Sequence, residues 1–202
     1  MRLTRNRLVC TLLCLTLWLI PSYNLNAQIA IKTNLVHGAT ATPNLGMEIG
    51  VARKSTIQLH YGLNPWNMKD NRKWKHWVLM PEYRWWLCNK FNGHFFGLHA
   101  MGGQFNLANI NVPTTGHFFG GDNIRNEVRD KNYEGSFAGV GLTYGYQWIL
   151  GRHFNIEAEL GAGYVHAWYD KYNCGECGPK ISDGQTNYVG LTKLGLSLLY
   201  LF

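Results

Sequence analysis

The most informative stretch of the chain, residues 136–169, reads SFAGVGLTYGYQWILGRHFNIEAELGAGYVHAWY. Between positions 154 and 168 the even-numbered residues are mostly bulky and apolar, whereas the odd-numbered ones include two glutamates and two glycines. A strand separates two such sets onto opposite faces, but a helix would mix them. The stretch therefore predicts two antiparallel strands joined by a tight turn at Gly151 and Arg152.

The same alternation recurs along the chain after residue 27. It predicts eight strands, which we place at Ile29–Val36, Leu45–Arg53, Thr56–Leu63, Trp74–Leu87, His94–Phe105, Ser136–Leu150, His153–Tyr169 and Tyr188–Phe202. Pro81 lies inside the fourth strand, and because proline lacks an amide donor we expect a bulge or a break in pairing there. The sequence thus indicates an all-β protein.

Composition narrows the class of protein further. Only 15% of the residues are charged, 14% are aromatic and 23 are glycine, which excludes a disordered chain and argues against a helical bundle. The mean hydropathy is −0.19 and no long apolar run occurs beyond residue 27, so a helical membrane protein is excluded as well. A β-barrel remains as the way in which this chain could span a membrane.

The first 27 residues have the layout of a secretory signal peptide. Three arginines precede an apolar stretch from Leu8 to Ile20, and a short polar segment then leads to Ala27. We expect cleavage near Ala27, which leaves residues 28–202 as one outer-membrane domain; the alternative is a retained anchor helix. Cleavage removes three basic residues and lowers the formal net charge from +7 to +4, too small an excess to predict nucleic acid as a partner.

The distribution of charge between the two strand faces distinguishes a membrane barrel from a soluble one. A soluble barrel places apolar side chains inside, whereas here the bulky face is apolar and the opposite face is charged. The charged residues on the small or polar face are Lys32, Glu48, Glu82, Arg84, Glu157, Glu159 and Lys193. Each Arg or Lys placed against lipid at the midplane would cost about 2–4 kcal/mol, so this face should line the interior.

The pattern therefore predicts an eight-stranded antiparallel up-and-down transmembrane β-barrel. So narrow a barrel has room for little beyond its own side chains, and we expect its polar residues to form a packed ionic network, not a pore. We expect His60, His76 and His99 to belong to this polar interior. The same charges argue against an interior site for an acyl chain.

Short and long connections alternate between the predicted strands, which places both termini and the short turns on the periplasmic side. Aromatic residues gather towards both ends of the strands, and we expect the membrane-interface anchors to be Trp77, Trp85, Trp148, Trp168, Tyr200 and Phe202. Trp74, Trp86 and Tyr169 fall in the same two groups. The terminal Phe202, with Tyr200 two residues before it, resembles the signal that delivers outer-membrane barrels to the barrel-insertion machinery.

Cys174 and Cys177 form a CxxCG motif in the last long loop. Three interpretations stay open: a local disulfide, which an oxidising compartment favours; a zinc knuckle completed by His37, His117 or a second chain; and a redox pair. We expect the disulfide, with Cys88 unpaired, and therefore neither a metal nor a cofactor.

His166 interrupts the apolar face of the seventh strand and is the candidate for a catalytic histidine at the outer interface. A histidine that reaches towards the headgroups is the more common explanation for such a position. No serine or acidic partner follows from the spacing, so we expect no catalytic site.

Several motifs resemble the Bacteroidota family called domain of unknown function 3575. They are Lys32-Thr33-Asn34-Leu35, Thr42-Pro43-Asn44-Leu45-Gly46, Asn64-Pro65-Trp66, Lys75-His76-Trp77, the segment from Phe91 to Ala100, Tyr144 to Trp148, Tyr169 to Tyr172, and the CxxCG element. The resemblance implies an outer-membrane barrel often encoded near fimbrial subunits, with no known catalytic residues.

Together these features predict a monomeric, non-enzymatic outer-membrane barrel that acts through its external loops as a surface or fimbria-assembly accessory. Its expected partners are outer-membrane lipid, the barrel-insertion machinery and fimbrial subunits. Two alternatives remain: a barrel enzyme acting on lipid A or a peptide, and a small porin.

Overall fold

A computed structural model describes residues 28–66, 73–108, 117–119, 131–173 and 179–202. The expected signal peptide and the CxxCG motif lie outside these ranges. The described elements are β1 (Ile29–Asn34), α2 (Leu35–Ala39), β2 (Asn44–Ala52), β3 (Ser55–Asn64), β4 (Lys73–Trp86), β5 (Gly93–Ala108), β6 (His117–Phe119), β7 (Lys131–Ile149), β8 (Phe154–Asn173) and β9 (Lys180–Leu201). The fold is all-β apart from one helical turn and a half.

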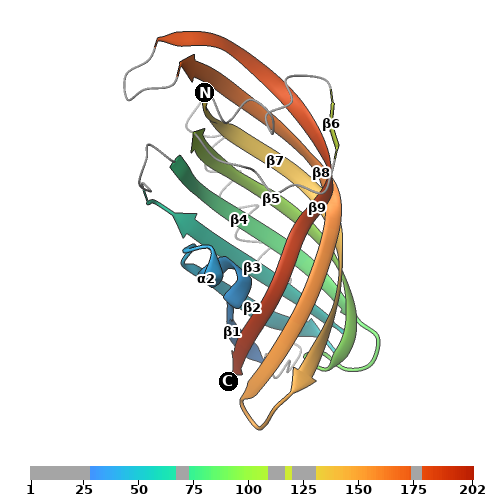
Figure 1. Ribbon diagram of the computed structural model, residues 1–202. Coiled ribbons are helices and arrows are strands. Elements are labelled where there is room, and N and C mark those ends of the chain that lie inside the picture. The colour runs from blue at the N-terminus through green and yellow to red at the C-terminus, as the bar shows by residue number, and fades with distance from the viewer. Residues whose placement is uncertain (1–27, 67–72, 109–116, 120–130, 174–178) are drawn as a thin grey trace, which may run out of the picture.

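The strands form one antiparallel sheet that closes on itself (Figure 1). Each long strand pairs with the next in the chain, and β1 pairs with β9, where Ala30 lies opposite Leu201 and Asn34 opposite Ser197. Strand β6 is not part of the ring: its three residues pair with β9 around Tyr188. Eight strands therefore make the ring, as the sequence predicts, and β6 is an additional element.

The wall of the ring differs in height around its circumference, because β1 has 6 residues and β9 has 22. Where β1 ends, the side chain of Asn34 takes the place of a neighbouring strand. Its amide donates to Leu194 O at 3.1 Å, and its oxygen accepts from Leu196 N at 3.4 Å. Beyond Leu194, β9 continues without β1 beside it.

The expected strand Ile29–Val36 is too long, because the chain turns into α2 after Asn34. Asn34 has an extended backbone, and its side-chain oxygen accepts a hydrogen bond from Val36 N at 3.0 Å, as an N-cap does. The five residues of α2 then carry His37 to the inner surface of β3, where its ring lies 5.3 Å from that of His60.

The strands also extend further than expected on the side of the long connections. Strands β7, β8 and β9 begin or end at Lys131, Asn173 and Lys180, well past the predicted limits. Pro81 keeps its register with Leu59 of β3, but the pairing with β5 is interrupted at Met80 and Pro81. The proline thus breaks the pairing on one side and makes no bulge.

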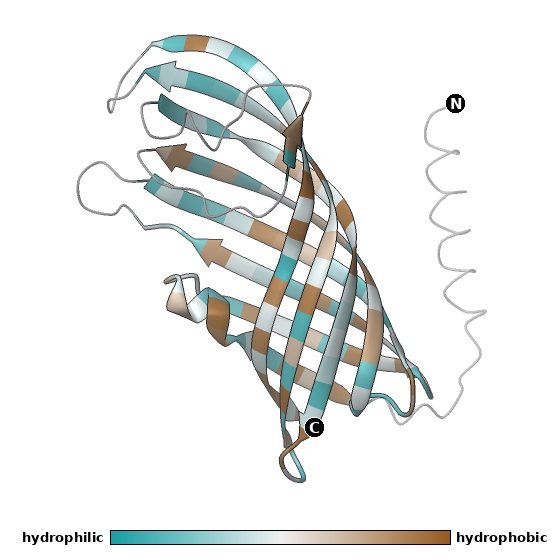
Figure 2. Cartoon of the chain, turned by 45° about the vertical axis from the view of Figure 1, so that its right-hand side comes forward, coloured by the Kyte–Doolittle hydropathy of each residue, from teal (hydrophilic) through white to brown (hydrophobic). Residues whose placement is uncertain are grey.

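Hydrophobic and hydrophilic residues alternate along the strands (Figure 2). The outward-facing residues along the middle of the strands are large and apolar, and many are exposed, for example Val140, Leu142, Leu160 and Leu196. The buried set includes more polar and charged residues than apolar ones. Among the described residues, no helix is long and apolar enough to cross a membrane.

Candidate functional site

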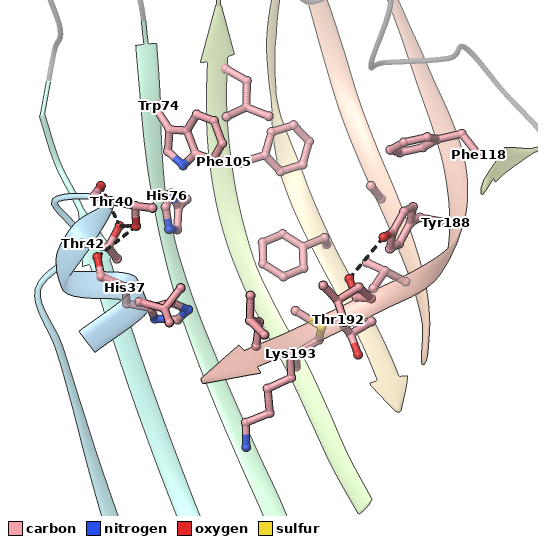
Figure 3. A pocket seen from close by; sticks show the side chains of 18 of the residues that line it. His37, Thr40, Thr42, Trp74, His76, Phe105, Phe118, Tyr188, Thr192 and Lys193 are labelled. Atoms are coloured by element: carbon pink, nitrogen blue, oxygen red, sulfur yellow. Dashed lines mark hydrogen bonds between the residues drawn. The ribbon is translucent and has the colours of Figure 1, made fainter. Parts of the chain in front are cut away.

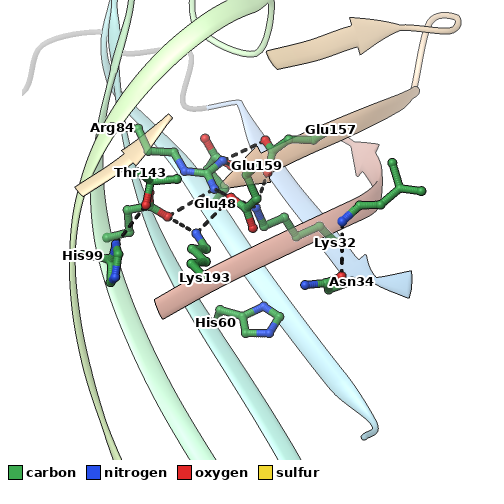
Figure 4. A network of polar contacts seen from close by, with 12 residues as sticks. Lys32, Asn34, Glu48, His60, Arg84, His99, Thr143, Glu157, Glu159 and Lys193 are labelled. Atoms are coloured by element: carbon green, nitrogen blue, oxygen red, sulfur yellow. Dashed lines mark hydrogen bonds and ion pairs between the residues drawn. The ribbon is translucent and has the colours of Figure 1, made fainter. Parts of the chain in front are cut away.

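The guanidinium of Arg84, on β4, lies at the centre of the interior and contacts four carboxylates (Figure 4). Its Nη1 lies 2.9 Å from Glu48 and 2.8 Å from Glu157, and its Nη2 lies 3.2 Å from Glu82 and 2.6 Å from Glu159. Arg84 is completely buried. A buried charge needs such partners, because desolvation without them costs several kcal/mol.

Two lysines complete this ionic network. Lys32 of β1 contacts Glu157 at 2.6 Å, and Lys193 of β9 contacts Glu159 at 2.9 Å and also Glu82. The structure thus brings together all seven charged residues that the sequence places on the inner face. They come from five strands and count three cations against four carboxylates, so the network carries one formal negative charge in excess.

Glycines on the inner face make room for these long side chains. A Cβ at Gly97 would overlap the carboxylate of Glu82, and one at Gly46 would come within 2.8 Å of the Lys32 side chain. The alternation of small and charged residues in the sequence is therefore a packing requirement of the interior.

An aromatic floor closes the ring on the side of the short turns. Trp86, Phe91 and Phe95 are at most 2% exposed, and the Phe95 ring lies 4.3 Å below the Arg84 guanidinium. Phe91 comes from the turn between β4 and β5, where it adopts a left-handed backbone (φ 61°) that directs the chain inwards. The expectation that Trp86 anchors the protein at the interface is wrong, because its side chain belongs to this floor.

Histidine and threonine side chains cover the other side of the network. His99 lies 2.9 Å from the Thr143 hydroxyl and 3.0 Å from that of Thr192, and His60 lies 3.4 Å from His37. Burial lowers the pKa of His37, an effect that the Glu159 carboxylate partly opposes. His37 therefore stays neutral at physiological pH.

Above this layer the interior becomes apolar and contains an open cavity of about 510 Å³ (Figure 3). Its apolar wall consists mainly of Trp74, Met101, Phe105, Leu107, Phe137, Val165, Ala167 and Tyr188. Lys193 and Thr192 lie at the floor, and His37, Thr40 and Thr42 at one side. The expectation that charged groups line the whole interior is wrong, because all seven ionic residues lie on one side of this cavity.

The cavity reaches the outer surface of the ring beside β9. Among the described residues, β9 pairs on this side with β1 at 197–201 and with β6 at 187–189, and no strand lies beside residues 190–196. Leu194 is 47% exposed and also lines the cavity. The wall therefore lacks strand pairing at this seam, where α2 contacts β9 instead.

Most of the expected interface anchors do face outwards. Trp85, Trp148, Trp168, Tyr200 and Phe202 are exposed, and Trp77 is half-buried with its indole nitrogen 3.0 Å from Gln104 Oε1. Two further members of these aromatic groups point inwards instead: Trp74 lines the cavity, and Tyr169 packs against Tyr133 at a ring distance of 5.2 Å. Neither is an interface anchor.

His166 faces outwards, as expected, and its partner is an amide. Its Nδ1 lies 2.7 Å from Asn187 Oδ1, which also accepts a hydrogen bond from the Tyr164 hydroxyl at 2.5 Å. The Trp168 ring packs edge-on at 4.4 Å. These contacts describe a polar and aromatic cluster on the outer face of β8 and β9.

The cysteine and metal expectations are only partly within the described residues. Cys88 is exposed, in the turn after β4, and has no disulfide partner there. Within the described part of the chain, no group of three or more histidine, cysteine, aspartate or glutamate side chains is arranged to hold a metal ion. Cys174 and Cys177 lie outside it.

Sequence reasoning missed the cavity because it assigned the whole inner face to one chemical class. A signal was present: Phe105, Phe137 and Val165 occupy inner-face positions, and all three are apolar. The outer positions opposite them on β7 and β8, Ser136 and His166, are polar. Along these strands the inner face therefore changes from polar to apolar, and the outer face changes from apolar to polar. The alternation of residue types alone does not reveal this change.

Comparison with known proteins places the chain in a family. No curated protein and no solved structure matches it significantly. A family model described as "Protein of unknown function (DUF3575)" matches residues 10–202, which is nearly the whole sequence. The chain belongs to this family.

Proposed function

We propose that the protein is a transmembrane eight-stranded β-barrel of the outer membrane, with a sealed interior, which acts at the cell surface through its long connections. The observation that carries the proposal is the reversed distribution of polarity. Seven charged side chains are buried within the ring, whereas its outer surface carries leucine, isoleucine and valine side chains at 37–68% exposure.

In water this outer surface would be unfavourable. Soluble proteins rarely expose a continuous apolar patch of more than a few hundred Å². Here exposed apolar residues occur on the outward face of every strand of the ring, so the patch encircles the molecule. Lipid removes that exposure and leaves the buried ion pairs undisturbed.

The height of the apolar band suits a membrane. On β8 the exposed aromatic residues Phe154 and Tyr164 are ten residues apart, with Leu160 between them. A strand tilted by about 45° needs about 9–11 residues to cross the hydrocarbon core. Beyond Tyr164 the outward positions include the polar residues His166 and Asp170, as expected for a strand that rises above the membrane.

The connections set the orientation. The turns after β2, β4 and β7 and both ends of the described chain lie at one end of the ring, and the strand ends that the longer connections join lie at the other. Outer-membrane barrels place short turns in the periplasm and long loops outside. The carboxyl-terminal β9, which ends the ring, would then be the strand presented to the insertion machinery.

A surface or assembly role is favoured over transport because buried side chains fill the ring on the side of the short turns. The aromatic floor and the ionic network occupy the cross-section of the ring one above the other. We further propose fimbrial subunits as the partner at the external end, on the basis of the family resemblance. We expect the protein to be a monomer, because its eight-stranded ring closes through its own β1 and β9.

Two measurements test this proposal. The first is to fold the mature protein into phosphatidylcholine vesicles and to compare heated and unheated samples by gel mobility and protease resistance. A compact, resistant form that depends on vesicles supports insertion, and a form that stays in the aqueous phase contradicts it. The second is to delete the gene in its native host and to quantify protease-accessible fimbrial subunits on intact cells. A selective loss that complementation restores supports the fimbrial role, and unchanged levels contradict it.

A further inference from the structure

We infer that the cavity above the ionic network binds a single long acyl chain, which enters sideways through the seam between α2 and β9. This inference rests on the proposed membrane location. It assigns a ligand class to a site in the half of the ring that lies towards the long connections.

The lining determines the ligand class. The cavity of about 510 Å³ lies within the range of about 300–1,000 Å³ that is usual for small-molecule sites. Aromatic and aliphatic side chains from β4, β5, β7, β8 and β9 provide most of its wall, including Trp74, Phe105, Phe137 and Val165. Such a wall can bury a hydrocarbon and offers few polar groups to a sugar or a nucleotide.

The position of the opening selects an acyl chain among apolar ligands. The seam lies beside residues 190–196 of β9, where β8 pairs with one edge of the strand and no described strand pairs with the other. The exposed side chains Val189 and Leu194 flank it on the outer surface, within the apolar band. In a membrane this opening would face the hydrocarbon core, which consists of lipid acyl chains.

A β-bulge shapes the opening and separates it from the charged interior. Gly161 of β8 pairs with Lys193, whereas the next residue, Ala162, pairs with Leu191, so Thr192 is an extra residue in β9. Below the bulge the inner face of β9 carries Lys193, and above it Tyr188 lines the cavity. Thr192 is held by His99 at 3.0 Å and forms part of the floor.

The floor is unsuited to an anionic headgroup. Lys193 is the cation nearest to the cavity, but it already faces Glu82 and Glu159, and the network has one carboxylate more than it has cations. A carboxylate or phosphate would therefore be repelled. The head should remain at the seam, near the exposed Thr40, and the chain should fill the apolar space.

Photolabelling tests this inference with the full mature protein in nanodiscs. Two probes are used separately: a phosphatidylcholine and a free fatty acid, each carrying a diazirine near the end of the acyl chain. Peptide mass spectrometry then locates the labelled residues. We expect labels on the cavity wall, at Phe105, Phe137 or Tyr188, in addition to labels on outward residues such as Leu142.

Ala167→Trp places a large side chain in the cavity, and Ala162→Trp places the same side chain on the outer face of the same strand. Gel mobility before and after heating verifies that both variants are folded. We expect Ala167→Trp to reduce cavity labelling at least five-fold and Ala162→Trp to leave it unchanged. If Ala167→Trp does not fold, competition of wild-type labelling by unlabelled fatty acid replaces it, and the same five-fold reduction is expected.

The labelling pattern distinguishes the source of the acyl chain, the existence of the cavity site and the membrane location. Cavity labelling by the phospholipid probe identifies a membrane lipid as the source, and cavity labelling by the fatty-acid probe alone identifies a free fatty acid. Labels on outward residues only would overturn the acyl-chain site and keep the membrane proposal. Labels on neither surface would overturn both. Cavity labelling that neither Ala167→Trp nor competition reduces would also contradict a specific site.

Discussion

Arg84 is the residue on which the largest number of interior contacts converge, since it holds four carboxylates from three strands. Its removal would leave Glu48 without a cation in direct contact among the described ion pairs, and the formal excess of the network would rise from one negative charge to two. The cost of breaking a buried ion pair in this way is typically about 3–5 kcal/mol.

We therefore expect Arg84→Ala to lower the free energy of unfolding by about 3–5 kcal/mol. The measurement is urea unfolding in phosphatidylcholine vesicles, followed by tryptophan fluorescence. Arg53→Ala is the matched control, because Arg53 is exposed in the turn between β2 and β3 and its loss should change stability by less than about 0.5 kcal/mol. Equal stability of the two variants would mean that the ionic network contributes little.

Gly97 tests the packing of the same network without altering its charge. A methyl group there would overlap the Glu82 carboxylate, so we expect Gly97→Ala to destabilise the protein by about 1–3 kcal/mol. Gly102→Ala, on the same strand, meets only Phe137 O at 3.7 Å and should be nearly neutral. The same unfolding assay measures both, and a neutral Gly97→Ala would show that Glu82 can move aside.

The lowered pKa of His37 determines the direction of one effect of pH on the free energy of unfolding. Burial lowers its pKa from 6.5, so below about pH 6.5 the unfolded chain takes up a proton that the folded protein refuses. This histidine therefore contributes a loss of stability as the pH falls below 6.5. Unfolding free energies at pH 8 and pH 5 should differ less in His37→Gln than in the wild type, and an equal difference would contradict the assignment.

At the scale of the strand, the outward face is the feature that commits the protein to lipid. Leu142 lies on the outer face of β7 and is 68% exposed, and Ser136 lies on the same face of the same strand, opposite Trp168. The proposed band ends between these two positions. The cost of a charge should therefore differ strongly between them.

We expect Leu142→Arg to lower the stability of the vesicle-folded protein by about 2–4 kcal/mol and Ser136→Arg to lower it by about 0–1 kcal/mol, because the cost of a charge depends on its depth in the bilayer. Urea unfolding in vesicles again supplies the numbers. Similar costs for both variants would argue that β7 does not lie in the membrane as we propose.

The strands could be predicted where the outward residues are consistently large and apolar and the inward residues are consistently small or polar. From Ile149 back to Gly139, large apolar and small residues alternate regularly, and the ring strand was predicted there. From Phe137 back to Asn132 the outer residues are polar while the inner ones include the aromatic Phe137 and Tyr133, so the segment resembles a loop. The exchange of polarity depends on where the membrane ends, which no local pattern encodes.

Helix α2 and strand β6 could not be predicted for a different reason. Five and three residues give too short a window for any periodicity, and both elements depend on contacts with β9. The ionic network was predictable residue by residue, because burying seven charges is possible only if they meet. The cavity was not, because it exists only where β1 stops short of β9.

At the scale of the whole molecule, the interior consists of successive layers with different roles. The aromatic floor and the ionic network fill the ring on the periplasmic side of our proposed orientation, and the apolar cavity lies on the external side. Of the seven charged residues only Lys193 lies at the lateral seam, and its ammonium is paired with Glu82 and Glu159. A membrane lipid could therefore enter the ring without meeting an unshielded charge, and without opening a path for ions.

The same layering predicts that the protein does not conduct. Trp86, Phe91 and Phe95 close the cross-section first, and Arg84 with its four carboxylates closes it again directly above. We expect no discrete current steps from the wild type in planar bilayers, with a general porin in the same bilayers as the positive control. Steps that disappear on boiling the sample would contradict the sealed interior, because they would require water to pass both layers. Phe95→Ala should remain closed as well, since the ion pairs of Arg84 persist when the floor alone is thinned.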